Sequence, residues 1–292
     1  MIDFRQLECF LAVADELHFG RAAGRLGMAQ PPLSQQILRL EQALDVRLFN
    51  RTSRMVSLTP AGEQLVINGR ELLALRHLSC VNARRAALGE VGHLNIGFGP
   101  STAFGLLPGL ISRYRAAYPD VELQVMEGNR ETHTQALLDG RLDVAFIRGP
   151  CRDPKLTVDR VLIEPIVAVL SSEHPLASEH AEEVSLRSLE SETLLIFERY
   201  LAPELYDSMV GMCSAAGLNP KLNYAANTWP SISALVTAGF GFALAPASAA
   251  LLLPQGAVAR RVTDASGECE LLIVSLRQRS AAADNFMKLC LT

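Results

Sequence analysis

Residues 3–44 carry apolar positions at the three- to four-residue spacing that predicts amphipathic helices. One such stretch spans residues 3–16, and a shorter one spans residues 19–26. Gly27 then tolerates positive φ, and a third helix opens at Pro31-Pro32, because prolines fit the first turn of a helix. Helix, tight turn and helix within about 25 residues form a helix-turn-helix. The apolar faces consist of Phe4, Leu7, Phe10, Leu11 and Ala14, of Phe19, Ala22, Ala23 and Leu26, and of Leu33, Ile37, Leu40 and Leu44.

The third helix has an opposite face of polar side chains that can hydrogen-bond base edges and phosphates. A solvated helix face is the ordinary alternative. Downstream, residues 48–58 indicate a short hairpin with Arg51 and Arg54 near its tip. A basic hairpin beside such a helix can act as a wing that reaches the DNA backbone or minor groove. The polar face consists of Gln30, Ser34, Gln35 and Arg39.

A long helix is expected next, because Thr59 can cap it and Pro60 suits its first position. No strong helix breaker follows until residues 89–92, which makes this helix longer than is typical. A stripe of leucines along it needs a partner surface, either a second copy of the chain or another part of the same chain. The stripe consists of Leu65, Leu72, Leu75 and Leu78.

From residue 93 onward, short apolar runs rich in β-branched residues alternate with helical stretches such as 104–118 and 132–139. This alternation predicts an α/β body of parallel sheets covered on both faces. Its length suits two lobes. The expected strands are residues 93–99, 121–126, 144–147, 166–170, 194–197, 242–244 and 271–275.

Ligands of open α/β sheets bind beyond the carboxyl ends of strands, often against helix N-termini. Three segments of the first lobe satisfy this description, and a small carboxylate between them would gain charge-assisted hydrogen bonds. Ser101 can equally be a plain helix cap, and Arg148 can equally pair with a nearby acid. Trp229 is either a cleft wall or core packing. The candidates are Pro100, Ser101, Thr102, Asn129, Arg130 and Arg148, joined from the second lobe by Phe197, Asn227 and Thr228.

Charge is distributed unevenly along the 292 residues, of which 49% are hydrophobic and 20% are charged. The formal net charge of -4 argues against a nucleic-acid partner. However, residues 1–90 hold 11 Arg and no Lys against 9 acidic residues, and the rest hold 16 basic against 22 acidic residues. Residues 1–90, the head, therefore have a net charge of +2, and residues 91–292, the body, have a net charge of -6. A basic head indicates that nucleic acid is still a candidate partner.

Several classes of protein are disfavoured. The N-terminus lacks a basic region followed by an apolar one, and no window of about 20 residues is free of polar side chains, so a cytoplasmic protein without a membrane span is expected. Six scattered cysteines without C-x-x-C fit reduced thiols. Walker, G-x-G-x-x-G, H-E-x-x-H and G-x-S-x-G motifs are missing, which disfavours an enzyme. Cys151 and Cys213 leave a thiol-based oxidant sensor as the alternative function.

Motifs between residues 19 and 62 closely resemble those of the LysR-type transcriptional regulators, and residues 232–246 match the family more loosely. One departure is His18, where the family usually has a small polar helix cap, so we expect a slightly looser second helix. The motifs are Phe19-x-x-Ala22-Ala23-x-x-Leu26, Gln30-Pro31-Pro32-Leu33-Ser34-Gln35-Gln36-Ile37-x-x-Leu40-Glu41, Leu48-Phe49-x-Arg51 and Leu58-Thr59-x-Ala61-Gly62.

The resemblance implies a winged helix-turn-helix DNA-binding domain over residues 1–58, a linker helix for dimerisation over 59–89 and an effector-binding domain over 90–292. This last domain would have a two-lobed periplasmic-binding-protein-like fold, with lobe I at about 90–163 plus 266–292 and lobe II at about 164–265. Crossings between the lobes are expected near 162–164 and 264–268.

Function follows from the same resemblance. It implies a regulator of promoter DNA that also contacts RNA polymerase, forms a dimer through the linker helix and then a tetramer, and needs no cofactor. A small, anionic effector would bind between the lobes, and the subgroup would respond to aromatic compounds or their ring-cleavage acids. The implied DNA-contacting residues are Gln30, Pro31, Ser34, Gln35, Arg39, Arg51 and Arg54, whereas Glu41 and Gln42 would be structural or solvated.

Overall fold

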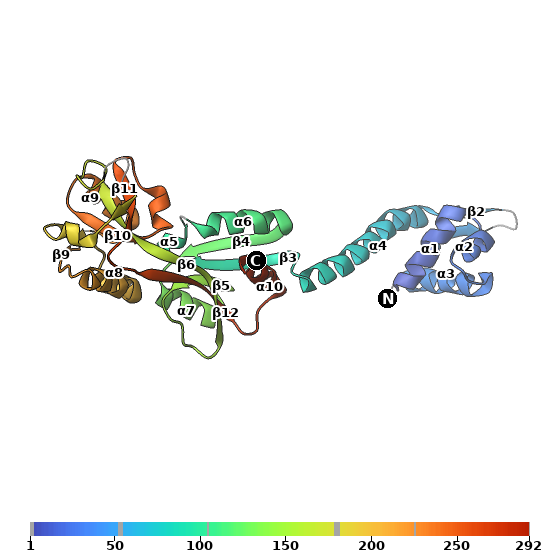
Figure 1. Cartoon of the computed structure of the whole chain (residues 1–292). Helices are drawn as coiled ribbons and strands as arrows, with labels where there is room; N and C mark the ends of the chain where they lie inside the picture. Colours follow the sequence, from blue (N-terminus) through green and yellow to red (C-terminus); the bar gives the residue numbers. More distant parts are fainter. Residues whose placement is uncertain (1–2, 52–54, 104, 178–181, 225, 292) are drawn as a thin grey trace. The chain divides into compact units, whose positions relative to one another are not determined.

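The structure is a computed structural model that describes residues 3–51, 55–103, 105–177, 182–224 and 226–291 (Figure 1). Internal contacts divide the chain into two compact units, residues 1–84 and residues 85–292. The first unit is mostly helical, and the second holds the larger sheet.

Three helices form the start of the N-terminal unit: α1 (Phe4–Glu16), α2 (Phe19–Arg25) and α3 (Gln30–Leu44). Gly27 connects α2 to α3 at φ 63°, which confirms the expected positive φ. His18 does cap α2, because its Nδ1 accepts hydrogen bonds from the backbone N–H groups of Gly20 at 3.1 Å and Arg21 at 3.2 Å. An unprotonated imidazole nitrogen therefore replaces the usual hydroxyl or carboxylate.

A hydrophobic core unites these helices with the hairpin of β1 (Phe49–Arg51) and β2 (Val56–Leu58), which pair antiparallel. Phe10 lies at its centre, 5.3 Å from the ring of Phe49. The apolar side of α3 enters the same core through Leu33, Ile37 and Leu40, all fully buried. Because these three residues fix the rotation of α3, its opposite side must face outward.

The long helix α4 (Pro60–Ala87) begins as expected, since Thr59 Oγ1 accepts the backbone N–H of Gly62 at 3.0 Å. The leucine stripe divides into two parts. Leu65 packs against the N-terminal core, whereas Leu72, Leu75 and Leu78 are exposed. Packing within the described N-terminal unit therefore leaves three of the four leucines of the stripe exposed.

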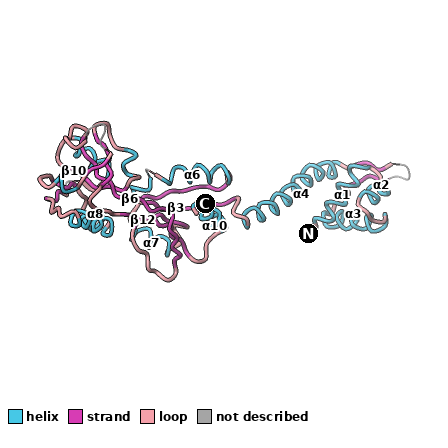
Figure 2. Tube along the Cα trace, viewed as in Figure 1, coloured by secondary structure: helices cyan, strands magenta, loops and turns pink. Residues whose placement is uncertain are grey.

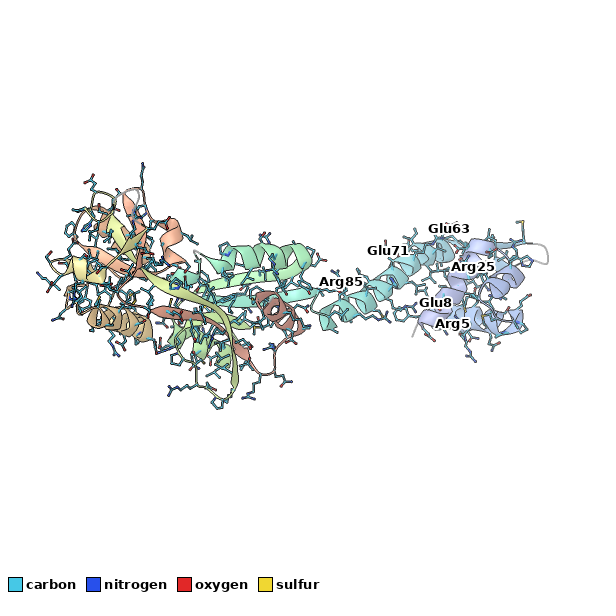
Figure 3. The ribbon with its side chains drawn as sticks, viewed as in Figure 1. Arg5, Glu8, Arg25, Glu63, Glu71 and Arg85 are labelled. Atoms are coloured by element: carbon cyan, nitrogen blue, oxygen red, sulfur yellow. The ribbon has the colours of Figure 1, made fainter. Side chains whose placement is uncertain are left out.

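Ion pairs attach α4 to α1 within the N-terminal unit. Glu8 accepts hydrogen bonds from Arg76 at 2.8 Å and from Arg5 at 3.3 Å, and Figure 3 labels the side chains of Arg5 and Glu8. The bond from Arg76 lowers the pKa of Glu8. Asp15 on α1 likewise accepts from Arg70 at 2.7 Å and from Arg25 at 2.9 Å. These pairs hold α4 against α1 along its length up to Arg76.

The second unit is an α/β body. Within its described residues, ten strands form a mixed sheet with the order β4-β3-β5-β12-β6-β10-β8-β9, in which β11 also pairs with β6 and β7 pairs with β11. The strands are β3 (Val91–Phe98), β4 (Asp120–Glu127), β5 (Val144–Arg148), β6 (Leu156–Ser171), β7 (Glu183–Val184), β8 (Thr193–Leu195), β9 (Lys221–Asn223), β10 (Phe242–Pro246), β11 (Ala257–Val262) and β12 (Glu268–Leu276).

Helices cover the sheet in two lobes (Figure 2). In the first lobe, α6 and α10 pack on one face and α7 packs on the other. In the second lobe, α8 and α9 share one core with β6, β8 and β10. The helices are α5 (Pro100–Ala103), α6 (Leu106–Ala117), α7 (Arg130–Leu138), α8 (Pro203–Ala215), α9 (Trp229–Thr237) and α10 (Ala281–Cys290), with 3-10 turns at Leu186–Leu189, Arg199–Leu201 and Ala249–Leu252.

The expectation of parallel sheets is correct for β3 with β4 and β5 but wrong for β6, and helices cover both faces of the sheet in the first lobe as expected. β6 pairs antiparallel with β12 over 156–165, and then with β10 and β11 over 166–171. The chain leaves the first lobe along β6 and returns along β12, so these two strands must run in opposite directions. Apolar periodicity carries no information on strand direction, which is why the sequence did not reveal it.

Gly62 gives a test of the packing of α4 on the hairpin. A Cβ there would lie 2.2 Å from the backbone carbonyl of Leu48, and backbone cannot move aside cheaply. We predict that Gly62→Ala destabilises the N-terminal unit by about 1–3 kcal/mol. Faster hydrogen exchange of the α1 and α3 amides measures this loss.

Gly24→Ala is the matched control, because no atom lies within 4 Å of the Cβ it adds on α2. It should leave exchange unchanged or slow it slightly, since alanine is the better helix former. Equal effects of the two substitutions would contradict the close packing of α4 on the hairpin.

Candidate functional site

The outer face of α3 presents the polar row that the sequence predicted. Gln30, Pro31, Gln35 and Arg39 are exposed, and Ser34 is half-buried. Exposed amide and guanidinium groups at this spacing suit base edges and phosphates in a major groove. Four of these five residues are therefore open to solvent, and Ser34 lies at the border between the exposed and buried sides of α3.

Arg51 has a structural role that the sequence did not reveal. Its guanidinium pairs with Glu41 of α3 at 3.0 Å and lies 4.8 Å from the ring centroid of Phe19. Glu41 also accepts the backbone N–H groups of Leu48 at 2.8 Å and Phe49 at 3.2 Å. The pair thus fastens the hairpin to α3. Arg54 lies outside the described residues.

A cavity of about 130 Å³ lies between the two lobes of the body. Seven of the predicted effector residues line it, whereas Thr102 does not, because its side chain is buried at 3% exposure. For Ser101 only the backbone is described, in α5. The predicted residues that line the cavity are Pro100, Asn129, Arg130, Arg148, Phe197, Asn227 and Thr228.

Helix caps and two aromatic rings shape this cavity. Asn129 caps α7 by accepting the backbone N–H of Thr132 at 2.9 Å, and Thr228 caps α9. Trp229 meets Phe197 edge to face, with ring centroids 5.7 Å apart. Trp229 both lines the cavity and packs against the core of the second lobe, so both of the roles considered for it apply.

Arg148 is paired with a buried carboxylate. It donates to Glu164 of β6, whose Oε2 accepts the backbone N–H of Ser248 at 2.5 Å and whose Oε1 accepts the Ser248 hydroxyl at 2.9 Å. Arg148 also contacts Cys269 Sγ at 3.2 Å. Because β5 lies in the first lobe and Ser248 in the second, this network joins the lobes where β6 crosses between them.

Arg130 makes a second link between the lobes. It stands at the start of α7 in the first lobe and donates to Glu204 at the start of α8 in the second. It also pairs with Glu131 at 2.9 Å. The hydrogen bond to Glu204 raises the pKa of Arg130 above its ordinary value. Both arginines of the cavity therefore have carboxylate partners.

The part of the chain that the structure describes gives little support to metal binding, membrane spanning or oxidant sensing by Cys213. It contains no cluster of three or more His, Cys, Asp or Glu side chains suited to a metal ion. None of its helices has the length and apolar character needed to cross a membrane. Cys213 is fully buried, and burial raises its pKa to about 11, whereas oxidant-sensing thiols are exposed and acidic. Cys151 is half-buried.

Comparison with known families identifies both units. Residues 4–63 match the family model described as "Bacterial regulatory helix-turn-helix protein, lysR family". Residues 87–292 match the one described as "LysR substrate binding domain". The chain belongs to the LysR family of transcriptional regulators. As a LysR regulator it binds DNA and has an effector-binding domain, and it is not an enzyme.

Similar proteins span nearly the whole regulator. The transcriptional regulator BudR of Raoultella terrigena is 36% identical over 291 residues, which cover 99% of this chain and 100% of BudR. AlsR of Bacillus subtilis (strain 168) is 36% identical over 248 residues, or 85% of this chain and 83% of AlsR. The crystal structure of the LysR family regulator CbnR superposes with a TM-score of 0.89 at 25% identity, covering 99% of this chain and 100% of CbnR.

Three further residues of this LysR regulator lie at or near the cavity and were not among the predicted site residues: Glu164, Glu204 and His133. Glu164 and Glu204 act through partners far away in the sequence, so no local spacing marks them. Glu164 lies just before the expected strand 166–170 and was not marked by it, whereas a histidine on the first turn of the expected helix 132–139 was the available signal for His133.

Glu164 provides a test of the link between the lobes. We predict that Glu164→Gln lowers the free energy of unfolding of the effector-binding domain by about 3–5 kcal/mol, because it removes the buried negative charge that pairs with Arg148. Urea denaturation followed by the fluorescence of Trp229, the only tryptophan of the sequence, measures this domain.

Glu270→Gln is the matched control, since the pair of Glu270 with Arg160 at 3.1 Å is half-exposed. Surface pairs contribute about 0–1 kcal/mol, so this change should be small. A loss at Glu164 no larger than that at Glu270 would contradict the role assigned to the buried network.

Proposed function

We propose that this LysR regulator reads promoter DNA with the outer face of α3, and that a small organic anion bound in the cavity between its lobes controls this binding. The observation that carries the proposal is the cavity itself, in which Arg130 and Arg148 from the first lobe face apolar residues of the second. Effector binding would draw the lobes together, change the angle between paired heads, and so alter the bend of the DNA and the contact with RNA polymerase.

The chemistry of each side chain indicates which DNA group it would contact. The amide groups of Gln30 and Gln35 suit adenine in the major groove, and Arg39 suits guanine or a phosphate. Pro31, which is exposed, and Ser34, which is half-buried, are their neighbours on α3. Arg51, held by Glu41, would position the hairpin that carries Arg54.

Gln35 tests this proposed interface. We predict that Gln35→Ala weakens specific binding to the region upstream of the regulator's own gene by about 1–3 kcal/mol, because it removes hydrogen bonds to a base. Arg39→Ala should also reduce the salt dependence of binding, by a slope of about 1 if Arg39 contacts a phosphate. Gel-shift titrations of the full-length chain at several salt concentrations measure both.

Gln42→Ala is the matched control, because Gln42 is an exposed glutamine near the other end of α3. It should bind as the unaltered regulator does. Equal losses at positions 35 and 42 would contradict the proposed orientation of α3 on DNA.

The size and lining of the cavity support a compact effector. Its volume of about 130 Å³ is close to that of an engineered cavity of about 150 Å³ that holds one benzene ring. Phe197 and Trp229 offer apolar ring contacts, and the arginines offer charge. We therefore propose an aromatic acid, or an acid formed by ring cleavage, as the effector class.

Glu204 is bonded to the Arg130 guanidinium group, which an anionic effector would need. Because Arg130 donates to Glu204 across the cavity, a carboxylate must replace or share this partner. The half-exposed position of Glu204 allows it to leave. Arg148 is held more firmly, since Glu164 is buried and bonded on both oxygens.

We predict that Glu204→Gln tightens the binding of benzoate by roughly ten-fold, because a charge-assisted bond to Arg130 no longer has an internal competitor. Isothermal titration calorimetry on the full-length regulator measures the dissociation constant. Asp207→Asn is the control: it removes one negative charge from the same helix, where Asp207 pairs with Arg199 at 2.6 Å. Benzoate binding unchanged by Glu204→Gln would contradict the competition.

The exposed leucines of α4 support a dimer. Leu72, Leu75 and Leu78 form an apolar strip that a second copy of α4 would cover. Two heads joined in this way would read two half-sites, which strengthens binding and spaces the contacts. We propose a dimer through this linker helix and a tetramer through further contacts of the effector-binding domains. The proposed domain limits are 1–58, 59–89 and 90–292.

A further inference from the structure

His133 is an unexplained polar group in the wall of the cavity. It stands in the first half of α7, one turn after Asn129, and its side chain is only 1% exposed. Neither ring nitrogen has a hydrogen-bond partner among the described residues, although the residue lines the cavity. Buried polar groups are almost always bonded, so an orphaned imidazole at a cavity wall needs an explanation.

Two glycines make room for this imidazole. A Cβ at Gly97 of β3 would lie 2.9 Å from His133 Cδ2, and one at Gly128 would lie 2.8 Å from His133 Nε2. Gly128 also lines the cavity, so the Nε2 edge lies against a wall that has no side chain. The ring is thus closely packed in one position, while its nitrogens remain without partners.

The chemistry of a neutral imidazole defines what can satisfy it. Burial lowers the pKa of His133, and the backbone of Met126 opposes this shift without forming a hydrogen bond of ordinary geometry. The ring is therefore neutral near pH 7, with one nitrogen that donates and one that accepts. A carboxylate can only accept, whereas a hydroxyl group can accept or donate and so fits either tautomer.

We propose that His133 is a specificity-determining residue that hydrogen-bonds a hydroxyl group of the effector, so that the cavity selects hydroxylated organic acids over the same acids without the hydroxyl. This inference rests on the proposed effector function of the cavity. In this arrangement Arg130 and Arg148 bind the carboxylate of the effector, and His133 forms a hydrogen bond with its hydroxyl group.

Pairs of acids that differ by one hydroxyl test the proposal. The probes are benzoate against 2-hydroxybenzoate and 3-hydroxybenzoate, propanoate against lactate, and succinate against malate. Calorimetric titration of the full-length regulator should show a hydroxy acid that binds roughly ten-fold or more tightly than its parent, since the bond satisfies a buried group. His133→Leu should bring this ratio close to one while leaving the affinity of the parent acid unchanged.

A second variant separates recognition from folding. His133→Gln keeps a donor and an acceptor near the position of Nε2, so it should retain part of the preference for the hydroxy acid. Ligand-free His133→Leu should unfold at the same temperature as the unaltered regulator or higher, because it removes unpaired polar atoms. If His133→Leu fails to fold, the ratio measured with His133→Gln decides: a ratio near one overturns the proposal.

The outcomes distinguish this inference from the proposed function. Equal binding of parent and hydroxy acids by the unaltered regulator overturns the role of His133 but leaves the anion site standing. A preference that survives His133→Leu does the same. If none of the seven acids binds, the proposed effector function fails and the inference fails with it.

Discussion

The buried carboxylate of Glu164 is the constraint on which the effector-binding domain depends. It lies on β6 at the passage between the lobes, where Arg148 comes from one side and Ser248 from the other. A buried charge is tolerated only when its partners are complete, so this position favours one arrangement of the two crossing strands. The cavity opens beside this network, with Arg148 as a member of both. A ligand that contacts Arg148 therefore acts directly on the junction between the lobes.

Two kinds of link hold the lobes together, and they differ in strength. The Arg148–Glu164 pair is buried and supported by Ser248, whereas the Arg130–Glu204 pair is half-exposed at the cavity. The buried pair suits a fixed hinge. The half-exposed pair suits a contact in which an anion can replace Glu204 as the partner of Arg130. In the N-terminal unit, the core residues Leu33, Ile37 and Leu40 play the corresponding fixed role, because they set which side of α3 faces outward.

The sequence predicted the helices of the N-terminal unit well, because amphipathic periodicity, the glycine at 27 and the cap at Thr59 are local signals. It also predicted the main strands of the body and seven residues that the structure brings to one cavity. It did not predict the antiparallel pairing of β6 with β12 or the short strands β7, β9 and β11, since direction and edge pairing depend on distant partners. The same reason hid Glu164 and Glu204, whose partners are 16 and 74 residues away.

The proposed control of DNA binding by an acid in the cavity is open to direct measurement. DNase footprinting of the region upstream of the regulator's own gene tests it most directly, with the unaltered regulator and Arg130→Ala compared in the presence and absence of a hydroxy acid that calorimetry shows to bind. We predict that the acid alters the protected region for the unaltered regulator and has no effect with Arg130→Ala. Identical footprints with and without the bound acid, or the same change in both proteins, would contradict it.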